Sequence, residues 1–478
     1  MTAAHEVVIV GGGPVGLWLA GELQLAGVRT VVLERLAEPS PHPKALGIHA
    51  RTLEVFAMRG MEKEFLAAGI KMPTWHFGML ATKLDFTTLD TPYPFVLAIP
   101  QNRTEAILQE RASALGAEII RGRTVTGLTE DESSVTVELA DGATFTGQYV
   151  VGADGAGSTV RHAAGIGFPG TDATVFGYLG DVVLDEPPPM GFSVHNEHGA
   201  LITAPIPGGF VRVSGYDVAD QEPGRREVTM DELRATATRI AGTDFGMRDP
   251  RWLSRFGNAT RHAETYRRGR VLLAGDAAHM HFPAGGVGLN TGVQDAMNLG
   301  WKLAAHVQGR SSEGLLDSYH DERHPLGADV AEHTLAQTAL ITATSAQGQA
   351  LRSLFGKLIT THPSLSLELA RKLAALDVHY PPTYADAHPL VGTRVAAAGE
   401  YLHSGAAVVL NMSGKPMDCV SDYARTSGIE IIPSTVELGA TTAAIIRPDG
   451  HVWWATDESD VDAATRVALA ELGTTFGR

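Results

Sequence analysis

The sequence predicts an α/β protein built around a Rossmann-like domain, and three strand-to-turn junctions indicate this fold class. The first junction is a glycine-rich turn at 11–16, directly after a short apolar run. The others are Asp154-Gly155 and Gly275-Asp276, each also placed after an apolar run. Short apolar runs that alternate with helical patterns are typical of βαβ units and a parallel sheet. We therefore expect the three turns to serve one extended ligand.

The composition is that of a globular protein larger than one typical domain. The chain has 478 residues, 44% hydrophobic and 19% charged, so we expect two or three domains. Its net charge of −16 argues against nonspecific binding of nucleic acid or anionic membranes. A single cysteine, Cys419, excludes an intramolecular disulfide and a cysteine-based metal site. We find no signal peptide and no membrane-spanning apolar run, so we expect a cytoplasmic location.

The first turn lies inside an N-terminal βαβ unit. Residues 5–10 predict a buried strand, residues 17–26 a helix and residues 28–33 a second strand. The turn between the first strand and the helix carries the Gly-x-Gly-x-x-Gly pattern. Because strand, turn, helix and second strand occur in the required order, the sequence predicts dinucleotide binding rather than a purely structural turn.

Four residues of this unit have separate roles in dinucleotide binding. Gly11 makes the tight turn, Gly13 lets the backbone reach a diphosphate, and Gly16 lets helix and strand pack closely. The helix N-terminus favours the negative charge of the diphosphate. Glu34 closes the second strand, where its carboxylate accepts hydrogen bonds from ribose hydroxyls.

The third turn has the features of a site for a sugar-phosphate ligand. A predicted strand at 271–274 leads into Gly275-Asp276, a loop with Pro283 and three glycines, and a helix expected from Thr291. The carboxylate of Asp276 is suited to hold sugar hydroxyls, and glycines let the backbone approach a flat ring. Free N–H groups at a helix start favour negative charge. Taken alone, the stretch could also be an ordinary surface turn.

Together these motifs resemble the single-component FAD-dependent aromatic hydroxylases, the class of p-hydroxybenzoate hydroxylase. The resemblance covers the whole chain and points in particular to bacterial aromatic polyketide hydroxylases and rifampicin monooxygenase. It implies FAD as cofactor, with NADPH or NADH and O2 as co-substrates. Besides the three turns, it rests on similar stretches at 46–56, 99–105, 257–260, 266–271 and 317–324.

The resemblance assigns several residues to the adenosine and diphosphate end of FAD. Glu34 would hold the adenosine ribose, with Arg35 beside the adenine end. The backbone of Val125 would meet the adenine. Gln101 would reach the ribityl or diphosphate region, and Asp154 would serve both FAD and nicotinamide-nucleotide binding.

At the flavin end, the resemblance implies that Asp276 binds the ribityl chain. Backbone N–H groups of Gly288, Leu289 and Asn290 would contact the pyrimidine edge of the ring and stabilise negative charge on the reduced flavin. The family usually has arginine where this chain has Lys44, which offers no planar fork to a phosphate. The expected FAD-binding residues are Gly11, Gly13, Val15, Gly16, Glu34, Arg35, Lys44, Gln101, Val125, Asp154, Asp276, Gly288, Leu289 and Asn290.

Three histidines, His49, His279 and His281, are expected near the proposed flavin loop. Histidine titrates near neutral pH, so any of them could deprotonate a phenol. We expect His279, His281 and Pro283 on the substrate side, but assign no catalytic base. Because His279 and His281 have no third ligand in sequence reach, no metal site is expected. The alternative is that these side chains only satisfy backbone hydrogen bonds.

The resemblance also divides the chain into domains. The FAD-binding domain would be discontinuous, formed by residues 1–71, 96–173 and 257–384. Residues 72–95 and 174–256, with aromatic side chains and short strands, would form an inserted β-sheet that covers the flavin and holds an aromatic substrate. Each aromatic side chain could instead belong to the core.

The last segment, residues 385–478, resembles the thioredoxin-like C-terminal domain of the polyketide hydroxylases. We expect strands at 406–411 and 442–447 and a helix at Asp418–Ser427. Thioredoxin-type redox chemistry needs two cysteines, and Cys419 is alone. We therefore expect a structural module or a dimer surface, in a monomer or homodimer.

The sequence thus predicts an FAD-dependent monooxygenase that hydroxylates a polycyclic phenolic substrate of the polyketide type. The family mechanism implies oxygen transfer through a flavin C4a-hydroperoxide, in antibiotic biosynthesis or inactivation. No second βαβ unit with a Gly-x-Gly-x-x-Gly turn is present, which fits the class in which NAD(P)H binds transiently without its own domain. Two alternatives are Baeyer–Villiger oxygenation on the same fold and an FAD protein that only sequesters an aromatic antibiotic.

Overall fold

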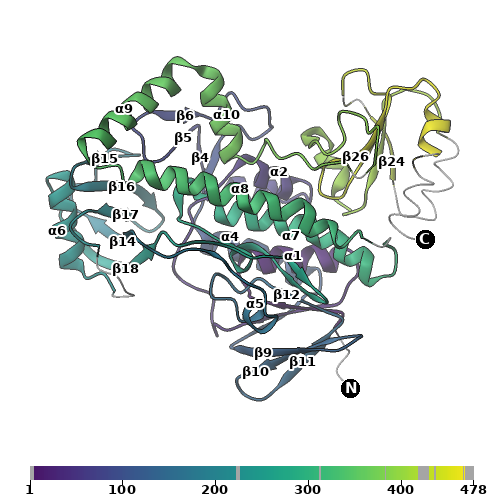
Figure 1. The fold of residues 1–478 in the computed structure, drawn as a ribbon, viewed down its shortest axis with the longest axis horizontal. Helices are drawn as coiled ribbons and strands as arrows, with labels where there is room; N and C mark the ends of the chain where they lie inside the picture. Colours follow the sequence, from purple (N-terminus) through teal and green to yellow (C-terminus); the bar gives the residue numbers. More distant parts are fainter. Residues whose placement is uncertain are drawn as a thin grey trace.

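The largest sheet of the described residues has six strands and is mostly parallel; Figure 1 labels its strand β12 near α1 (Pro14–Leu25) and α5 (Thr159–Ala163). The computed structural model describes residues 5–221, 227–311, 314–382, 384–417, 430–434, 436, 438–466 and 468. The α/β architecture predicted from the sequence is confirmed. In spatial order, the strands are β20 (Arg267–Arg268), β21 (Val271–Leu273), β12 (Tyr149–Gly152), β1 (Val7–Val10), β2 (Thr30–Glu34) and β8 (Glu118–Arg121).

Helices cover this sheet because packing against it removes their apolar side chains from water. Helix α1 (Pro14–Leu25) packs against α7 (Gly288–Val307) and α4 (Gln101–Ala114). Pro14 suits the first turn of α1, where its missing N–H costs no hydrogen bond. Trp18 is fully buried in the core that the sheet and α1 share. A small sheet of β9 (Val125–Glu130), β10 (Val135–Leu139) and β11 (Thr144–Gly147) lies near the N-terminus.

A five-stranded antiparallel sheet stands at one end of the molecule, with α6 (Met230–Ala241) packed on it (Figure 1). Helix α6 starts with a capping box, in which the Thr229 hydroxyl and the Glu232 carboxylate each accept a backbone N–H of the other residue. In spatial order, the strands are β15 (Ser193–Asn196), β16 (Gly199–Ile206), β17 (Phe210–Asp217), β14 (Phe176–Leu184) and β18 (Met247–Gly257).

The segment 72–95 does not pair with this five-stranded sheet. Its β5 (Thr74–His76) and β6 (Lys83–Asp85) form a separate hairpin, whose side chains pack with α9 (Ala346–Thr361) and α10 (Pro363–Leu373). The flanking strands β3 (Gly47–Ile48), β7 (Val96–Ala98) and β4 (Ile70–Met72) make a three-stranded sheet. Three further elements near the site are α2 (Ala50–Ala57), α3 (Glu62–Ala68) and α8 (Ser318–Ile341).

The C-terminal part contains a four-stranded sheet at the other end of the molecule (Figure 1). β23 pairs parallel with β24 and antiparallel with β25. The helix expected at Asp418–Ser427 and Cys419 lie outside the described residues, so the thioredoxin-like arrangement stays a prediction. In spatial order, the strands are β24 (Glu430–Pro433), β23 (Val408–Asn411), β25 (Ala443–Ile446) and β26 (Val452–Thr456).

Within the described ranges, no helix has both the length and the hydropathy that crossing a membrane requires. Among the same residues, no group of three or more His, Cys, Asp or Glu side chains is placed to hold a metal ion.

Candidate functional site

The glycine turn after β1 leaves open space at the N-terminus of α1. A Cβ at Gly11, where φ is +111°, would lie 2.2 Å from the carbonyl oxygen of Ala153, and a Cβ at Gly16 would lie 2.0 Å from that of Gly11. No heavy atom lies within 4 Å of the Cβ position of Gly13, which precedes α1 without a side-chain cap. The free N–H groups of α1 therefore face a space that a diphosphate fits.

Glu34 lies beside this turn at the end of β2. Its Oε2 accepts a hydrogen bond from the Gly12 N–H at 2.6 Å, and its Oε1 accepts one from the Leu36 N–H at 2.9 Å. Each carboxylate oxygen retains a further acceptor position for a ribose hydroxyl. Arg35 next to it is exposed, and Val125 is buried at the start of β9.

The second turn, after β12, uses its carboxylate to cap a helix. Asp154 Oδ1 accepts from the Ser158 hydroxyl at 2.5 Å, and its Oδ2 accepts from the Val160 N–H at 3.2 Å. Burial raises the pKa of Asp154, although these hydrogen bonds oppose the shift. Asp154 thus has a structural task that the sequence did not reveal, and its contact with a nucleotide stays a prediction.

The third turn, after β21, presents a carboxylate that has no hydrogen-bond partner among the described residues. Asp276 is exposed and lies in a short 3-10 segment (Gly275–Ala277). Gly275 has φ +62°, and a Cβ there would lie 2.9 Å from the Val15 side chain. Val15 thus packs under the third turn, so the first and third turns support each other.

Helix α7 begins at Gly288, and the expected start at Thr291 was wrong. Gly288 to Asn290 therefore form the first turn of the helix, and Val287 before them makes no side-chain cap. The Asn290 side chain fixes this start: its Nδ2 donates to the carbonyl oxygens of Gly286 at 2.9 Å and Gly47 at 3.1 Å. The unpaired N–H groups of the first turn remain available to an acceptor.

Asp295, on α7 beneath the third turn, was not predicted from the sequence as a site residue. Its Oδ2 accepts from the Gly275 N–H at 3.1 Å and from His279 Nε2 at 2.7 Å. Its Oδ1 accepts from Arg323 Nε at 2.8 Å. Burial opposes ionisation, but the charges of Arg323 and His279 outweigh it and lower the pKa of Asp295 to about 2. Asp295 thereby fixes the residue that precedes Asp276.

The two histidines of the connecting loop have different surroundings. His279 is 1% exposed and bound to Asp295, so its expected place on the substrate side does not fit the structure. His281 is only partly buried, and its Nε2 lies 3.4 Å from the Cβ position of Gly288. Burial lowers the pKa of His281. Pro283 is exposed beside the loop, so His281 and Pro283 remain candidates there.

His49 lies across the loop from α7 and is fully buried. Its Nε2 lies 3.0 Å from the Gly285 carbonyl oxygen, which also accepts from Trp75 Nε1 at 3.1 Å. Burial lowers the pKa of His49 to about 4, so the ring is neutral near pH 7. A neutral ring has one nitrogen free to accept a proton or hydrogen bond.

The loop that carries Lys44 is held by the five-stranded sheet. Arg212 of β17 donates to the carbonyl oxygens of Lys44, at 2.8 Å, and Pro43, and it pairs with the buried Asp181. Gln101 accepts from the Ala45 N–H at 3.0 Å and donates to Glu105 at 2.8 Å. Its side chain thus supports the loop, and contact with FAD stays a prediction.

The order of strands places the candidate groups along one edge of the six-stranded sheet. Asp276 follows β21, Asp154 follows β12, Gly13 follows β1 and Glu34 ends β2, which is also the spatial order of these strands. A carboxylate for one sugar, a helix N-terminus for a diphosphate and a carboxylate for a second sugar lie in this order. Such an arrangement suits an extended dinucleotide. The carboxylate of Asp276 and the open space at Gly13 fit FAD.

Comparisons with known proteins also indicate a protein that binds FAD. A family model described as an FAD binding domain matches residues 4–334. A rifampicin monooxygenase of Streptomyces venezuelae is 42% identical over 465 residues, 95% of this chain and 96% of that protein. The structure of anhydrotetracycline hydroxylase from Streptomyces rimosus has a TM-score of 0.89 and 40% identity, covering 100% of both chains. A dialkyldecalin synthase of Streptomyces rugosporus is 39% identical over 471 residues, 96% of this chain and 98% of that protein.

Proposed function

The chain belongs to the FAD binding domain family and is an FAD-dependent monooxygenase, and we propose that it hydroxylates a polycyclic phenolic substrate of the polyketide type. The family predicted from the sequence motifs is confirmed. The observation that carries the proposal is the line of Asp276, Gly13 and Glu34 along one sheet edge, next to the uncapped start of α7.

Each part of this line has a task in binding the cofactor. FAD, when bound, supplies the redox chemistry that accepts electrons from NAD(P)H and activates O2. The N–H groups of α1 hold the diphosphate, and Asp276 holds the ribityl chain. The first turn of α7, Gly288 to Asn290, would hold the pyrimidine edge of the ring through its backbone N–H groups. The positive end of this helix would favour negative charge there.

The apolar side chains between the five-stranded sheet and the η2 segment (Ala284–Gly286) are where we place the substrate. Phe282 and Phe256 lie with ring centroids 5.3 Å apart, and they pack with Met79, Tyr216 and Ile341. Aromatic side chains bury large area and offer faces to a planar ligand. The adjacent His281 and His49 have lowered pKa values and are neutral near pH 7. His281 Nδ1 lies 2.8 Å from the Phe282 carbonyl oxygen, which leaves Nε2 to accept the proton of a phenol, whereas His49 is fully buried.

A substrate screen tests this proposal directly. The purified protein should be yellow with a flavin spectrum, and it should oxidise NADPH or NADH faster when a suitable polycyclic phenol or ansamycin is added. Product mass should increase by one oxygen atom. A colourless protein that cannot be reconstituted with FAD would contradict the proposal. Ring expansion of a ketone, with the same mass gain, would instead identify Baeyer–Villiger oxygenation.

A second candidate follows from the dialkyldecalin synthase, whose name describes a product rather than an oxygenation. On this candidate, the protein binds FAD and an aromatic or polyketide ligand without oxidising it. It predicts FAD binding and ligand binding, but no ligand-dependent oxidation of NAD(P)H. The same screen separates the two, because only the monooxygenase adds oxygen to its substrate.

A further inference from the structure

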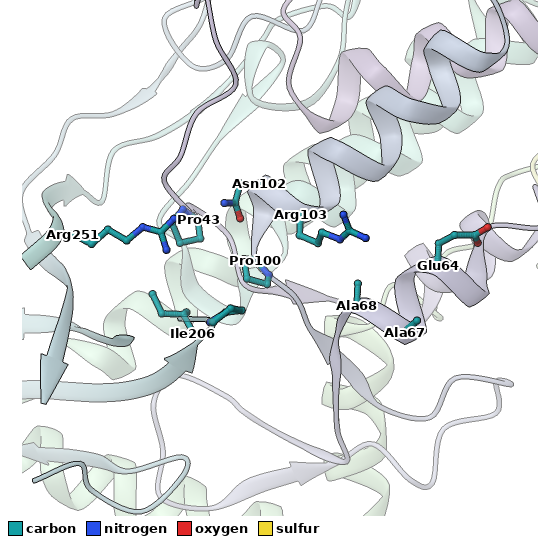
Figure 2. Close-up of a pocket in the computed structure, with 10 residues that line it drawn as sticks. Pro43, Glu64, Ala67, Ala68, Pro100, Asn102, Arg103, Ile206 and Arg251 are labelled. Carbon is teal, nitrogen blue, oxygen red and sulfur yellow. The ribbon is translucent and has the colours of Figure 1, made fainter. Parts of the chain in front are cut away.

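A surface hollow of about 410 Å³ lies at the N-terminus of α4, next to the candidate FAD site (Figure 2). Its walls come from the Pro43 loop, from α3 and from the five-stranded sheet, which contributes Ile206 and Arg251. Asn102 and Arg103 stand at its centre on the first turn of α4. Several segments that are far apart in sequence therefore meet in one hollow.

The hollow is positively charged, although the whole chain is strongly acidic. It contains two guanidinium groups, Arg103 and Arg251, and one carboxylate, Glu64, in a chain with a net charge of −16. Among the described residues, the Arg103 guanidinium has no hydrogen bond or ion pair, although the Arg103 backbone N–H donates to the Pro100 carbonyl oxygen at 2.9 Å. Arg251 donates to the Pro41 carbonyl oxygen at 3.1 Å and has no carboxylate partner within the same part of the chain. The uncapped start of α4 adds further positive potential.

Apart from Asn102, the rest of the lining is apolar. Pro43, Pro100, Ile206 and Pro207 offer ring faces and methyl groups without competing hydrogen-bonding side chains. A volume of about 410 Å³ lies in the range of small-molecule sites. Arginines against apolar walls suit a ligand that combines phosphate groups with a planar base, and a nucleotide has both.

The hollow is separate from the dinucleotide site but adjoins it. Neither Gly13 nor Asp276 lines it, so FAD bound along the sheet edge leaves it free. Pro43 and Pro100 directly precede Lys44 and Gln101, two of the residues expected at FAD. The Arg212 side chain fixes the Pro43 wall from the sheet. A ligand in this hollow thus lies next to the cofactor on a supported surface.

We propose that this hollow docks the ADP-ribose half of the nicotinamide nucleotide, with Arg103 and Arg251 on its phosphates. This inference rests on the proposed function, which requires NAD(P)H to reach the flavin. The chain has only one Gly-x-Gly-x-x-Gly βαβ unit, so the nicotinamide nucleotide needs another surface. Weak, exposed arginine contacts suit a reductant that binds transiently and leaves once it is oxidised.

Binding of non-redox fragments to the FAD-loaded protein tests the docking independently of turnover. We would titrate ADP-ribose and 2′-phospho-ADP-ribose by calorimetry into wild type, Arg103→Ala, Arg251→Ala and the double variant. The double variant should weaken binding of the better fragment at least about tenfold, because both charged hydrogen bonds to the phosphates are lost. Arg251→Lys should restore part of the loss, because it keeps the charge without the fork.

Two controls separate this site from general charge effects. Arg29→Ala removes an exposed arginine elsewhere, whose partner is Glu6 at 3.4 Å, and should leave fragment binding unchanged. The FAD content of the double variant should equal that of wild type. In steady-state assays, the KM for NAD(P)H should rise in the double variant while kcat at saturation changes little.

The docking proposal is wrong if wild type binds neither fragment, or if the double variant binds them as tightly as wild type. It is also wrong if inorganic phosphate displaces the fragments at equal concentration, since the hollow would then be an anion site only. A yellow enzyme that adds oxygen to substrate with an unchanged KM for NAD(P)H in the double variant would refute the docking alone. A colourless protein would refute the proposed function instead.

Discussion

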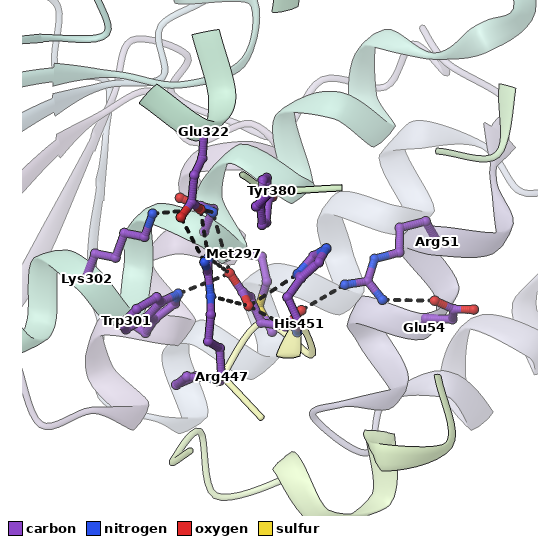
Figure 3. Close-up of polar contacts among 12 residues, drawn as sticks. Arg51, Glu54, Met297, Trp301, Lys302, Glu322, Tyr380, Arg447 and His451 are labelled. Atoms are coloured by element: carbon purple, nitrogen blue, oxygen red, sulfur yellow. Dashed lines mark hydrogen bonds and ion pairs between the residues drawn. The ribbon is translucent and has the colours of Figure 1, made fainter. Parts of the chain in front are cut away.

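Arg447 and Glu322 form a two-point ion pair between the C-terminal sheet and α8 (Figure 3), with Nη1–Oε1 and Nη2–Oε2 distances of 2.8 Å. Both side chains are buried, and Lys302 of α7 donates to the same carboxylate at 2.8 Å. Arg447 also pairs with Asp449 at 2.5 Å. The pair therefore links the last sheet to α8 and, through Lys302, to α7, the helix whose first turn we propose to bind the flavin.

Replacing Arg447 should strongly destabilise the protein. Arg447→Met leaves the buried carboxylates of Glu322 and Asp449 without their guanidinium partner, and we expect the free energy of unfolding to fall by about 3–5 kcal/mol. Urea unfolding followed by circular dichroism measures the change. Arg29→Met, at a 59% exposed side chain, is the control and should cost less than about 1 kcal/mol. Equal stability of the two variants would contradict the prediction.

The stability of the fold should decrease in acid because of two buried carboxylates. Burial opposes ionisation of Glu322, but the charges of Arg447 and Lys302 outweigh it and lower the pKa of Glu322 to about 2. In the same way, Arg323 and His279 lower the pKa of Asp295 to about 2. Both pKa values lie below those of the unfolded chain, so the unfolded state binds more protons as the pH falls. The stabilisation is complete above about pH 4.5 and is lost as pH falls towards 2, on the order of 2–3 kcal/mol per group. Urea unfolding at pH 7, 5, 4 and 3 should show this decline, and a flat profile would exclude it.

Two glycines of the first turn should respond differently to alanine. Gly13→Ala adds a methyl group to open space, so we expect normal thermal stability but weaker FAD binding, because the methyl group occupies the diphosphate position. Gly16→Ala places its methyl 2.0 Å from the Gly11 carbonyl oxygen and should lower both stability and FAD content. Thermal unfolding of the apoproteins and flavin absorbance give the two readouts. Unchanged FAD affinity in Gly13→Ala would argue against a diphosphate there.

The carboxylate of Asp276 should matter for the cofactor and not for the fold. Asp276 is exposed and forms no hydrogen bond to the other described residues through its side chain, so Asp276→Ala should leave apoprotein stability within about 0.5 kcal/mol. FAD affinity should fall by about 1.5–3 kcal/mol, roughly 10- to 150-fold, since a charged hydrogen bond to the ribityl chain is lost. The FAD affinity of Asp276→Asn should lie between those of wild type and Asp276→Ala. Titration of apoprotein with FAD measures the dissociation constant, and equal values for all three proteins would remove Asp276 from the ribityl role.

Local sequence patterns predicted the parts of the site that depend on backbone geometry. The βαβ unit, the open position of Gly13 and the carboxylates at strand ends follow from glycine placement and apolar runs, which act over a few residues. The start of α7 was misplaced by three residues, because the Asn290 side chain bonds to Gly47 and Gly286 and holds the first turn. Asn290 and Gly47 are 243 positions apart in the sequence, and local periodicity does not predict contacts over such a separation.

The sequence by itself determined the family and the FAD cofactor, because both depend on short motifs with their own backbone requirements. Only the tertiary structure decided which side chains support that motif. Three supporting contacts are made by charged residues that nothing in the sequence distinguishes. Asp295 accepts from the Gly275 N–H, Arg212 donates to the Lys44 carbonyl oxygen, and Arg447 pairs with Glu322. Their partners come from other elements, and burial makes each pair strong by excluding water from it.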